Sequence, residues 1–221
     1  MDSLIHGTPM TTHAALQIKL EQGIDALGLQ LPTEAVQRLL DYLALLERWN
    51  AAYNLTAIRD PAEMVTRHLL DALAILPYVQ GGTLADLGTG PGIPGIPLAI
   101  AAPGRQVLLV DSNGKKVRFL REAIRALKLE GVRAVQSRVE EVEGQFDCIT
   151  ARAFASLTDM LGWGGHLLAP QGIWLAMKGK APDDEFPGVP PAFAVRAIHP
   201  LNVPGLGAAE RHLVVLGRAG C

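Results

Sequence analysis

A glycine-rich segment between an apolar run and a helical segment constrains the fold of this chain more than any other feature. Residues 84–95 read LADLGTGPGIPG, so an expected strand at Thr83–Leu87 is followed by closely spaced glycines and by a helix that begins near Gly95. Glycines allow positive φ and a close approach of backbone to ligand, and a helix N-terminus offers unpaired N–H groups. The segment therefore predicts an α/β protein with a ligand-binding turn at the edge of its sheet.

Short apolar runs alternate with helical segments after Gly81-Gly82, which predicts a mostly parallel sheet covered on both faces. The expected strands are Thr83–Leu87, Gln106–Val110, Arg133–Gln136, Phe146–Thr150 and Ile173–Met177, and the expected helices begin at Gly95, Gly114 and Ala155. The chain ends differently. Two further strand-like runs, Phe193–His199 and Arg211–Leu216, are joined by a segment without room for a crossover helix, so we expect an antiparallel C-terminal hairpin.

The N-terminal part has the spacing of helices rather than of strands. Apolar residues recur at three- and four-residue steps from Ala14 to Leu29 and from Thr33 to Trp49, with Thr33 as the expected N-cap of the second helix. Asp60-Pro61 is the expected start of a third helix. We therefore expect a loose tail at residues 1–12, a helical appendage at 13–80 and a ligand-binding domain at 81–221.

Composition limits the classes of function. A chain of 221 residues with 49% hydrophobic content can form one domain with an appendage, and a net charge of −2 argues against a nucleic-acid binder that uses its whole surface. Any nucleic-acid site is expected to be a local patch. The two cysteines, Cys148 and Cys221, give neither a disulfide framework nor a metal-ligand spacing. We therefore expect no metal site. No apolar stretch reaches the ~20 residues that span a bilayer, so we expect a cytoplasmic protein.

Two ligand classes fit the glycine-rich segment. Gly90–Gly95 satisfies the pattern GxGxxG, and Asp111 follows at the end of the next strand, as in dinucleotide-binding proteins. Asp86, however, precedes the first glycine, Gly88, by two positions, where its charge would oppose a pyrophosphate but could accept hydrogen bonds from an ammonium group. S-adenosylmethionine has that ammonium group, and Asp111 could hold its ribose. The alternatives are that Asp86 caps its own turn and that Asp111 is a simple turn residue.

Several short motifs in a fixed order add a more specific signal. Together they resemble the small-subunit ribosomal RNA guanine-N7 methyltransferases once called glucose-inhibited division protein B, over about residues 35 to 217. The motifs are Asn54-Leu55-Thr56-Ala57-Ile58, Arg67-His68-Leu69-Leu70-Asp71, the loop Asp86–Pro97, Asp111-Ser112 with Lys115–Leu120, Ser137-Arg138-Val139-Glu140 and Ala151-Arg152-Ala153-Phe154.

The resemblance implies a Rossmann-like class I methyltransferase that methylates N7 of one guanine in 16S ribosomal RNA with S-adenosyl-L-methionine. It implies that Gly88, with Gly90, and Ile93 contact the cofactor, and that Arg138 and Val139 lie along its adenine. The sequence departs from the family where Ala151 replaces a frequent serine and Asp111 a frequent glutamate. The alternatives are a methyltransferase acting on a small molecule or protein, and a nicotinamide-dependent oxidoreductase or inactive nucleotide-binding module.

The expected chemistry needs no general base, because N7 of guanine carries a lone pair and no proton. We therefore expect no catalytic dyad, and alignment of the base with the methyl group would supply most of the rate. Arg152 is the candidate positioning residue and would bind O6, a phosphate or the cofactor carboxylate, since a donor on N7 would block attack. The alternative interpretation is that Arg152 is a surface arginine at a strand end.

A locally basic segment is the candidate contact to RNA phosphates. Basic residues outnumber acidic ones between residues 105 and 138. The basic residues are Arg105, Lys115, Lys116, Arg118, Arg121, Arg125, Lys128, Arg133 and Arg138. We expect Lys115, Lys116 and Arg118 to contact 16S RNA or the small ribosomal subunit, together with Arg67 and His68 of the appendage, in a monomeric protein. The alternatives are a solvated helix face and, for His68, a packed side chain.

Overall fold

The computed structural model describes residues 12–152 and 155–220, so most of the predicted tail, Ala153, Phe154 and Cys221 lie outside the described residues. The helices are α1 (His13–Ala26), α2 (Thr33–Tyr53), α3 (Pro61–Met64), the π-helix η1 (Val65–Leu70), α4 (Asp71–Leu73), α5 (Gly95–Ala101), α6 (Gly114–Ala126) and α7 (Leu157–Gly164), with short 3-10 turns η2 (Leu76–Tyr78), η3 (Val139–Glu141), η4 (Gly165–Leu167) and η5 (Phe186–Gly188). The strands are β1 (Thr83–Leu87), β2 (Gln106–Asp111), β3 (Val132–Gln136), β4 (Phe146–Arg152), β5 (Leu168–Lys178), β6 (Phe193–Pro200) and β7 (His212–Arg218).

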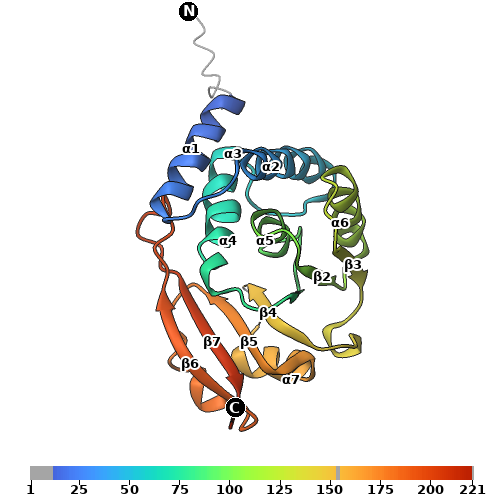
Figure 1. Cartoon of the computed structure of the whole chain (residues 1–221), viewed down its shortest axis with the longest axis vertical. Coiled ribbons are helices and arrows are strands. Elements are labelled where there is room, and N and C mark those ends of the chain that lie inside the picture. Colours follow the sequence, from blue (N-terminus) through green and yellow to red (C-terminus); the bar gives the residue numbers. More distant parts are fainter. Residues whose placement is uncertain (1–11, 153–154, 221) are drawn as a thin grey trace, which may run out of the picture.

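The strands form one sheet in the order β3-β2-β1-β4-β5-β7-β6 (Figure 1). The first five strands are parallel, β7 pairs antiparallel with β5, and β6 pairs antiparallel with β7. This arrangement confirms the mostly parallel sheet and the antiparallel C-terminal hairpin. The last strand lies inside the sheet, between β5 and β6, and therefore joins the hairpin to the parallel part.

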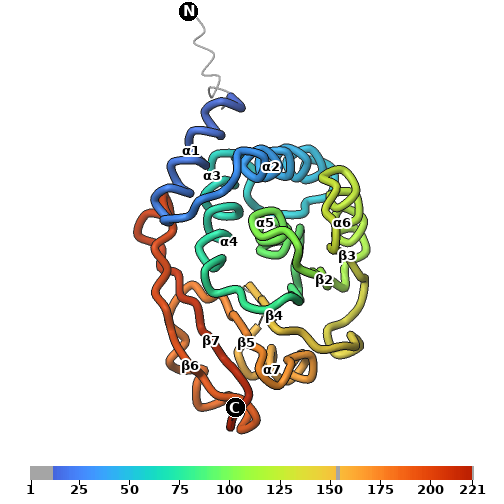
Figure 2. Tube along the Cα trace, in the orientation of Figure 1, coloured from blue at the N-terminus to red at the C-terminus, as the bar shows by residue number. Residues whose placement is uncertain are grey.

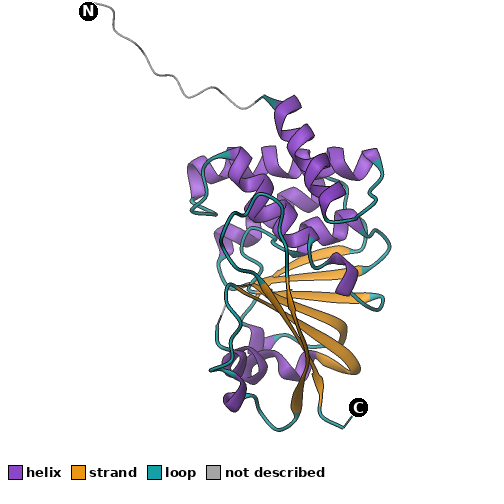
Figure 3. Ribbon diagram, turned by 90° about the vertical axis from the view of Figure 1, so that its left-hand side faces the viewer, coloured by secondary structure: helices purple, strands orange, loops and turns teal. Residues whose placement is uncertain are grey.

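Helices cover the two faces of the sheet unequally. Leu84, Leu109 and Leu175 point to one face, where they share a hydrophobic core with residues of α1, α2, α5 and α6. The alternate positions, such as Ala85 and Val110, point to the other face and pack with α7 and η3. Figure 3 shows most helices on one side of the sheet and α7 on the other. The expectation of a sheet covered on both faces is confirmed.

The helical appendage packs directly on this core. In Figure 2, α2 lies against α5 and α6 rather than apart from them. Leu39, Leu40 and Leu46 of α2 are buried in the same cluster as Ile96 of α5 and Phe119 of α6. Within the described residues, none of the helices is long and apolar enough to cross a membrane.

Two helix ends differ from the sequence prediction because single residues adopt positive φ. The first helix ends at Ala26, before Gly28 at φ 69°, and the second continues to Tyr53 and ends at Asn54, whose φ is 51°. The prediction that Thr33 is an N-cap was wrong. Pro32 takes that position, and its carbonyl accepts a hydrogen bond from the N–H of Ala35 at 2.9 Å.

The third helix starts as expected but changes type. The side chain of Asp60 accepts a hydrogen bond from the N–H of Ala62, and Pro61 occupies the first turn. The helix then widens into the π-helix η1 before α4, which the sequence did not predict. The helix expected from Ala155 begins at Leu157, because Ser156 is its N-cap.

Candidate functional site

A cavity of about 450 Å³ opens at the carboxyl ends of the first four strands. Open α/β sheets bind their ligands at this position. It is the place where the connections that follow two neighbouring strands run in opposite directions. The lining residues are Gly88, Val110, Asp111, Ser112, Lys116, Ser137, Arg138, Val139, Glu140, Arg152 and Trp163. Five residues predicted for the cofactor or its surroundings therefore meet around one cavity: Gly88, Asp111, Arg138, Val139 and Arg152.

The glycine-rich turn requires glycine for two reasons. Gly88, Gly90 and Gly92 have φ of 65°, 61° and 99°, a region that other L-residues rarely adopt. Gly95, at the first turn of α5, is required for close packing, since a Cβ there would lie 2.8 Å from Oδ2 of Asp86 and would also meet Leu109. The turn thus brings the start of α5 against the end of β1.

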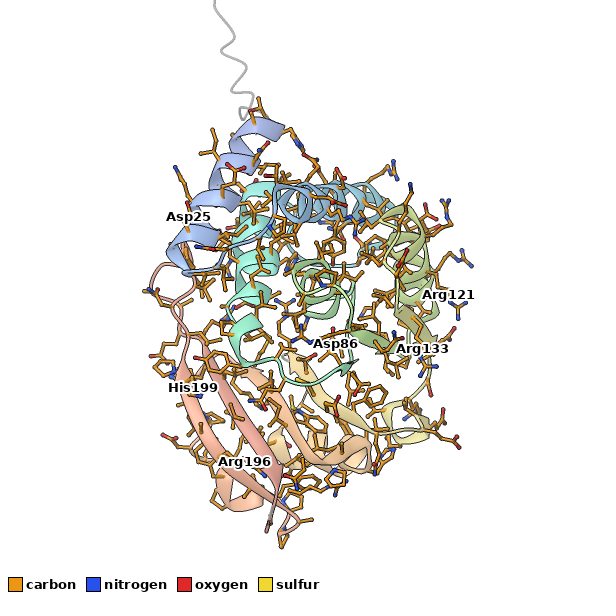
Figure 4. All side chains as sticks on the ribbon, in the orientation of Figure 1. Asp25, Asp86, Arg121, Arg133, Arg196 and His199 are labelled. Atoms are coloured by element: carbon orange, nitrogen blue, oxygen red, sulfur yellow. The ribbon has the colours of Figure 1, made fainter. Side chains whose placement is uncertain are left out.

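Asp86 organises this turn from inside the protein. Its side chain is fully buried and accepts hydrogen bonds from Thr89 Oγ1, from the N–H of Gly95 at 2.8 Å and from Thr150 Oγ1 at 3.0 Å. Burial raises the pKa of Asp86 to about 6, although these hydrogen bonds favour the charged form. Figure 4 shows Asp86 in the interior. The structure therefore favours the alternative in which Asp86 caps its own turn over direct contact with a ligand.

Asp111 connects the glycine-rich turn to the next turn. Its Oδ2 accepts a hydrogen bond from the N–H of Gly90 at 2.9 Å, and its Oδ1 accepts one from the N–H of Asn113 at 2.8 Å. Lys116 Nζ lies 3.6 Å from Oδ2. Asp111 is thus fixed at the cavity wall, where its carboxylate can still accept hydrogen bonds from a ligand, since two oxygens offer about four lone-pair sites.

Arg138 and Val139 line the cavity together with an aromatic side chain. Trp163 on α7 is half-buried and lines the cavity beside them. Ile93 and Gly90, by contrast, are buried and do not line it, and Ile93 is 2% exposed within the core. The structure therefore places the Ile93 side chain under the turn, and the expected contact of Ile93 with a cofactor stays a prediction that only its backbone could fulfil in this conformation.

Arg152 lies where the end of β4 meets the helical appendage. Its Nη1 donates to Oδ2 of Asp71 at 3.1 Å and to the carbonyl oxygen of Arg67 at 2.9 Å. Asp71 is fully buried, and its other oxygen accepts a hydrogen bond from Nε of Arg211 at 2.9 Å. Arg152 is therefore held in an ion pair rather than extended as a free surface arginine.

His68 is not available to RNA at the surface, contrary to the sequence prediction. Only 3% of it is exposed, and its Nε2 lies 3.0 Å from the hydroxyl of Thr56. Burial lowers the pKa of His68 to about 4, helped by the nearby charge of Arg152. A neutral histidine packed in this position matches the alternative of a packed side chain. Arg67, the preceding residue, is exposed.

The basic segment divides between two edges of the sheet, so its cations do not form one continuous face, and the expected RNA contacts at Lys115, Lys116 and Arg118 stay a prediction. Lys115, Arg118 and Arg121 line a depression beside the start of α6, at the carboxyl edge of β2. Arg105 and Lys128 line another at the amino edge, because β2 and α6 each cross the sheet between them. In Figure 4, Arg121 and Arg133 lie at the periphery, beside α6 and β3.

Comparison with known families identifies the chain. The model of the family described as rRNA small subunit methyltransferase G matches residues 35–214. The chain belongs to this family. It is 57% identical over 205 residues to ribosomal RNA small subunit methyltransferase G of Stenotrophomonas maltophilia K279a, covering 92% of this chain and 95% of that protein. It is 56% identical to the protein of the same name from Xanthomonas euvesicatoria, over 89% and 92% of the two chains. The resemblance based on the motifs is confirmed.

Solved structures support the fold. TrmN from Thermus thermophilus superposes with a TM-score of 0.57 at 21% identity, over 70% of this chain and 53% of that one. Magnesium protoporphyrin IX methyltransferase from Synechocystis, solved with bound SAM, also gives 0.57 at 12% identity, over 80% and 97%. The expected Rossmann-like class I methyltransferase fold is confirmed.

Two of the motifs that carry the resemblance lie at the junction of appendage and sheet rather than in the cavity. The N–H of Thr56 donates to the side chain of Asn50, and the Thr56 hydroxyl meets His68. Asp71, from the second motif, holds Arg152. A third contact of this kind runs from the hydroxyl of Tyr42 to the carbonyl oxygen of Pro91 at 2.8 Å. The sequence did not predict it, because in the helical pattern Tyr42 looks like any other core position of an amphipathic helix.

Among the described residues, no group of three or more histidine, cysteine, aspartate or glutamate side chains could hold a metal ion.

Proposed function

We propose that this protein transfers a methyl group from S-adenosyl-L-methionine to N7 of one guanine in 16S ribosomal RNA. Membership of the methyltransferase G family carries the proposal. The cavity at the carboxyl ends of the strands supplies the geometry, because Asp111 is tied to the glycine-rich turn by a 2.9 Å hydrogen bond at the place where this fold class binds its cofactor. When bound, the cofactor supplies a methyl group on a positively charged sulfur.

The residues of the cavity fit this cofactor. Asp111 would accept hydrogen bonds from the ribose hydroxyls, and the positive φ of Gly88 keeps the backbone accessible beside it. Val139 and Trp163 offer apolar and aromatic surface, with Arg138 at the rim, to an adenine ring. These contacts bind and orient the ligand without taking part in bond formation.

The acceptor needs positioning rather than activation. N7 carries no proton, so the protein's contribution is to orient the base and exclude water, and none of its residues needs to act as a general base. Arg152 stands at the edge of the cavity with its Nη1 held by Asp71 and Arg67. It would act as a positioning residue for an anionic or carbonyl oxygen of a bound ligand.

The RNA contact surface would lie beside the cavity at the start of α6. Lys115, Arg118 and Arg121 line a neighbouring depression, Lys116 lines the cavity itself, and Arg67 is exposed on the appendage. Clustered cations of this kind bind phosphates by releasing counterions, and a local cluster is compatible with the net charge of −2. The partner would be 16S ribosomal RNA or the small subunit, and the protein would act in the cytoplasm.

Transfer of tritiated methyl from S-adenosylmethionine tests the proposal. The acceptors are naked 16S RNA and small ribosomal subunits from a strain that lacks this protein. Label that maps to one N7-methylguanine supports it, and label that appears only in a small molecule or a protein favours the alternative substrate class. Asp111→Ala should weaken binding of S-adenosylhomocysteine with the fold intact, while Asp25→Ala on the exposed side of α1 is the matched control.

A further inference from the structure

The carbonyl of Arg67 and the carboxylate of Asp71 reach Arg152 from a helix of unusual geometry. The π-helix Val65–Leu70 immediately precedes Asp71, and π-turns interrupt the regular α-helical hydrogen-bond pattern and occur frequently at functional sites. Within the described residues, both hydrogen bonds of Arg152 use Nη1, at 2.9 and 3.1 Å. Its Nε and Nη2 remain able to donate to a ligand in the cavity that Arg152 lines.

A buried carboxylate is a costly way to hold two elements together. Asp71 is 0% exposed, and its two oxygens are shared between Arg152 at 3.1 Å and Arg211 at 2.9 Å. Burying charges removes them from water, and apolar residues of similar size often give as much stability as a buried ion pair. Stability alone therefore gives little reason for a carboxylate here, whereas a carboxylate orients a guanidinium group by a strong, charge-assisted hydrogen bond.

The cluster formed by Asp71, Arg152, Arg211 and His68 also keeps an excess of positive charge. Two guanidinium groups share one carboxylate, and His68 stays neutral because its pKa is lowered to about 4. Since Arg211 does not line the cavity, the part of this charge that faces it belongs to Arg152. A rigid cation at the edge of a cavity is suited to an anionic oxygen.

We infer that Asp71 is a positioning residue that fixes Arg152 to bind the carboxylate of the amino-acid part of the cofactor. The inference rests on the proposed function for the identity of the ligand. Asp71 touches neither cavity nor ligand and acts only through Arg152, which separates its role from that of Asp111. A purely structural Asp71, which ties the residue before β7 to the helical appendage through Arg211, is the competing explanation.

Two ligands separate these explanations. S-adenosylhomocysteine carries the amino-acid part with its carboxylate, and 5′-methylthioadenosine lacks it while keeping the adenine and ribose. Isothermal titration calorimetry of Asp71→Asn should show binding of S-adenosylhomocysteine weakened by about tenfold, a factor typical of one charge-assisted hydrogen bond. Binding of 5′-methylthioadenosine should change less than about twofold, because its contacts lie elsewhere in the cavity.

Arg211 provides the control for charge and for folding. Arg211→Gln keeps the pair of Asp71 and Arg152, and should leave both affinities within about threefold of the parent. The double variant Asp71→Asn, Arg211→Gln has the same net charge in the cluster as the parent and should lose affinity for S-adenosylhomocysteine as Asp71→Asn does. It also carries the test if Asp71→Asn alone does not fold, because it removes one of the two uncompensated arginines.

Equal weakening of both ligands in Asp71→Asn would overturn the inference in favour of a structural role. Unchanged binding of both, or loss of S-adenosylhomocysteine affinity in Arg211→Gln as large as in Asp71→Asn, would overturn it as well. Methyl transfer to RNA is measured separately on the parent protein. Failure there, with selective loss of S-adenosylhomocysteine binding in Asp71→Asn, would remove the RNA substrate and keep the role of Asp71.

Discussion

Replacement of Asp86 by asparagine should make the protein more stable relative to the parent as pH rises. Asp86 is fully buried, and burial raises its pKa to about 6 in the folded protein from 3.8, the ordinary value expected in the unfolded chain. The folded state therefore binds the proton more tightly. The stability that protonated Asp86 contributes is present below about pH 4 and is lost as pH rises through 6. For a shift of about two pKa units, this contribution amounts to about 3 kcal/mol.

Asparagine removes the charge and can keep the hydrogen bonds. Its carbonyl oxygen can accept from the N–H of Gly95 and from Thr89, and its amide can donate to the hydroxyl of Thr150, which can act as acceptor. The free energy of unfolding of Asp86→Asn minus that of the parent should therefore increase by about 2 kcal/mol between pH 4 and pH 7.

Urea unfolding followed by circular dichroism at a series of pH values measures this difference. The subtraction cancels the titration of all other groups, provided that both proteins unfold in two states. Asp25→Asn, at an exposed position of α1, is the matched control and should give a difference that does not vary with pH. A pH-independent difference for Asp86→Asn would refute the reasoning, because it would mean that burial does not raise the pKa of this carboxylate.

Three further substitutions test neighbouring contacts by the same unfolding assay. His68→Gln should show the opposite dependence and become more stable relative to the parent by about 3 kcal/mol as pH falls from 6.5 to 4. The reason is that the pKa of His68 is about 4 in the folded protein, so the unfolded chain takes up a proton on this histidine at a higher pH than the folded protein does. Tyr42→Phe should cost about 1 kcal/mol, since the carbonyl of Pro91 loses its buried donor. Gly95→Ala should cost about 1–3 kcal/mol, because the added methyl group would press on Asp86.

The sequence predicted most strands because strands buried on both faces form short apolar runs between helical segments, and the first strand, Thr83–Leu87, was placed to the residue. The fifth was predicted only from Ile173 to Met177, whereas it extends from Leu168 to Lys178. Pro170 and Gly172 lie in the missed part and are typical of turns. They are tolerated because the register of β5 against β4 shifts there, which releases the backbone from regular pairing.

The same distinction between local and distant information applies to the site. The glycine-rich turn and Asp111 were predictable, because a strand end, a turn and a helix start follow each other in the sequence. The contacts between Arg152 and Asp71 and between Tyr42 and Pro91 join residues 81 and 49 positions apart. Each depends on how the appendage packs on the sheet, and no local pattern encodes that packing.

These two contacts also change the meaning of the division near residue 81. Hydrophobic periodicity changes there from helical to alternating strand and helix, so the sequence suggests an appendage and a domain. In the structure, α2 buries its apolar side in the core of the sheet, Tyr42 donates to the carbonyl of Pro91 in the glycine-rich turn, and Asp71 holds Arg152 at the cavity. Movement of the appendage would therefore displace groups of the cavity directly, because its helices form part of the cavity's support.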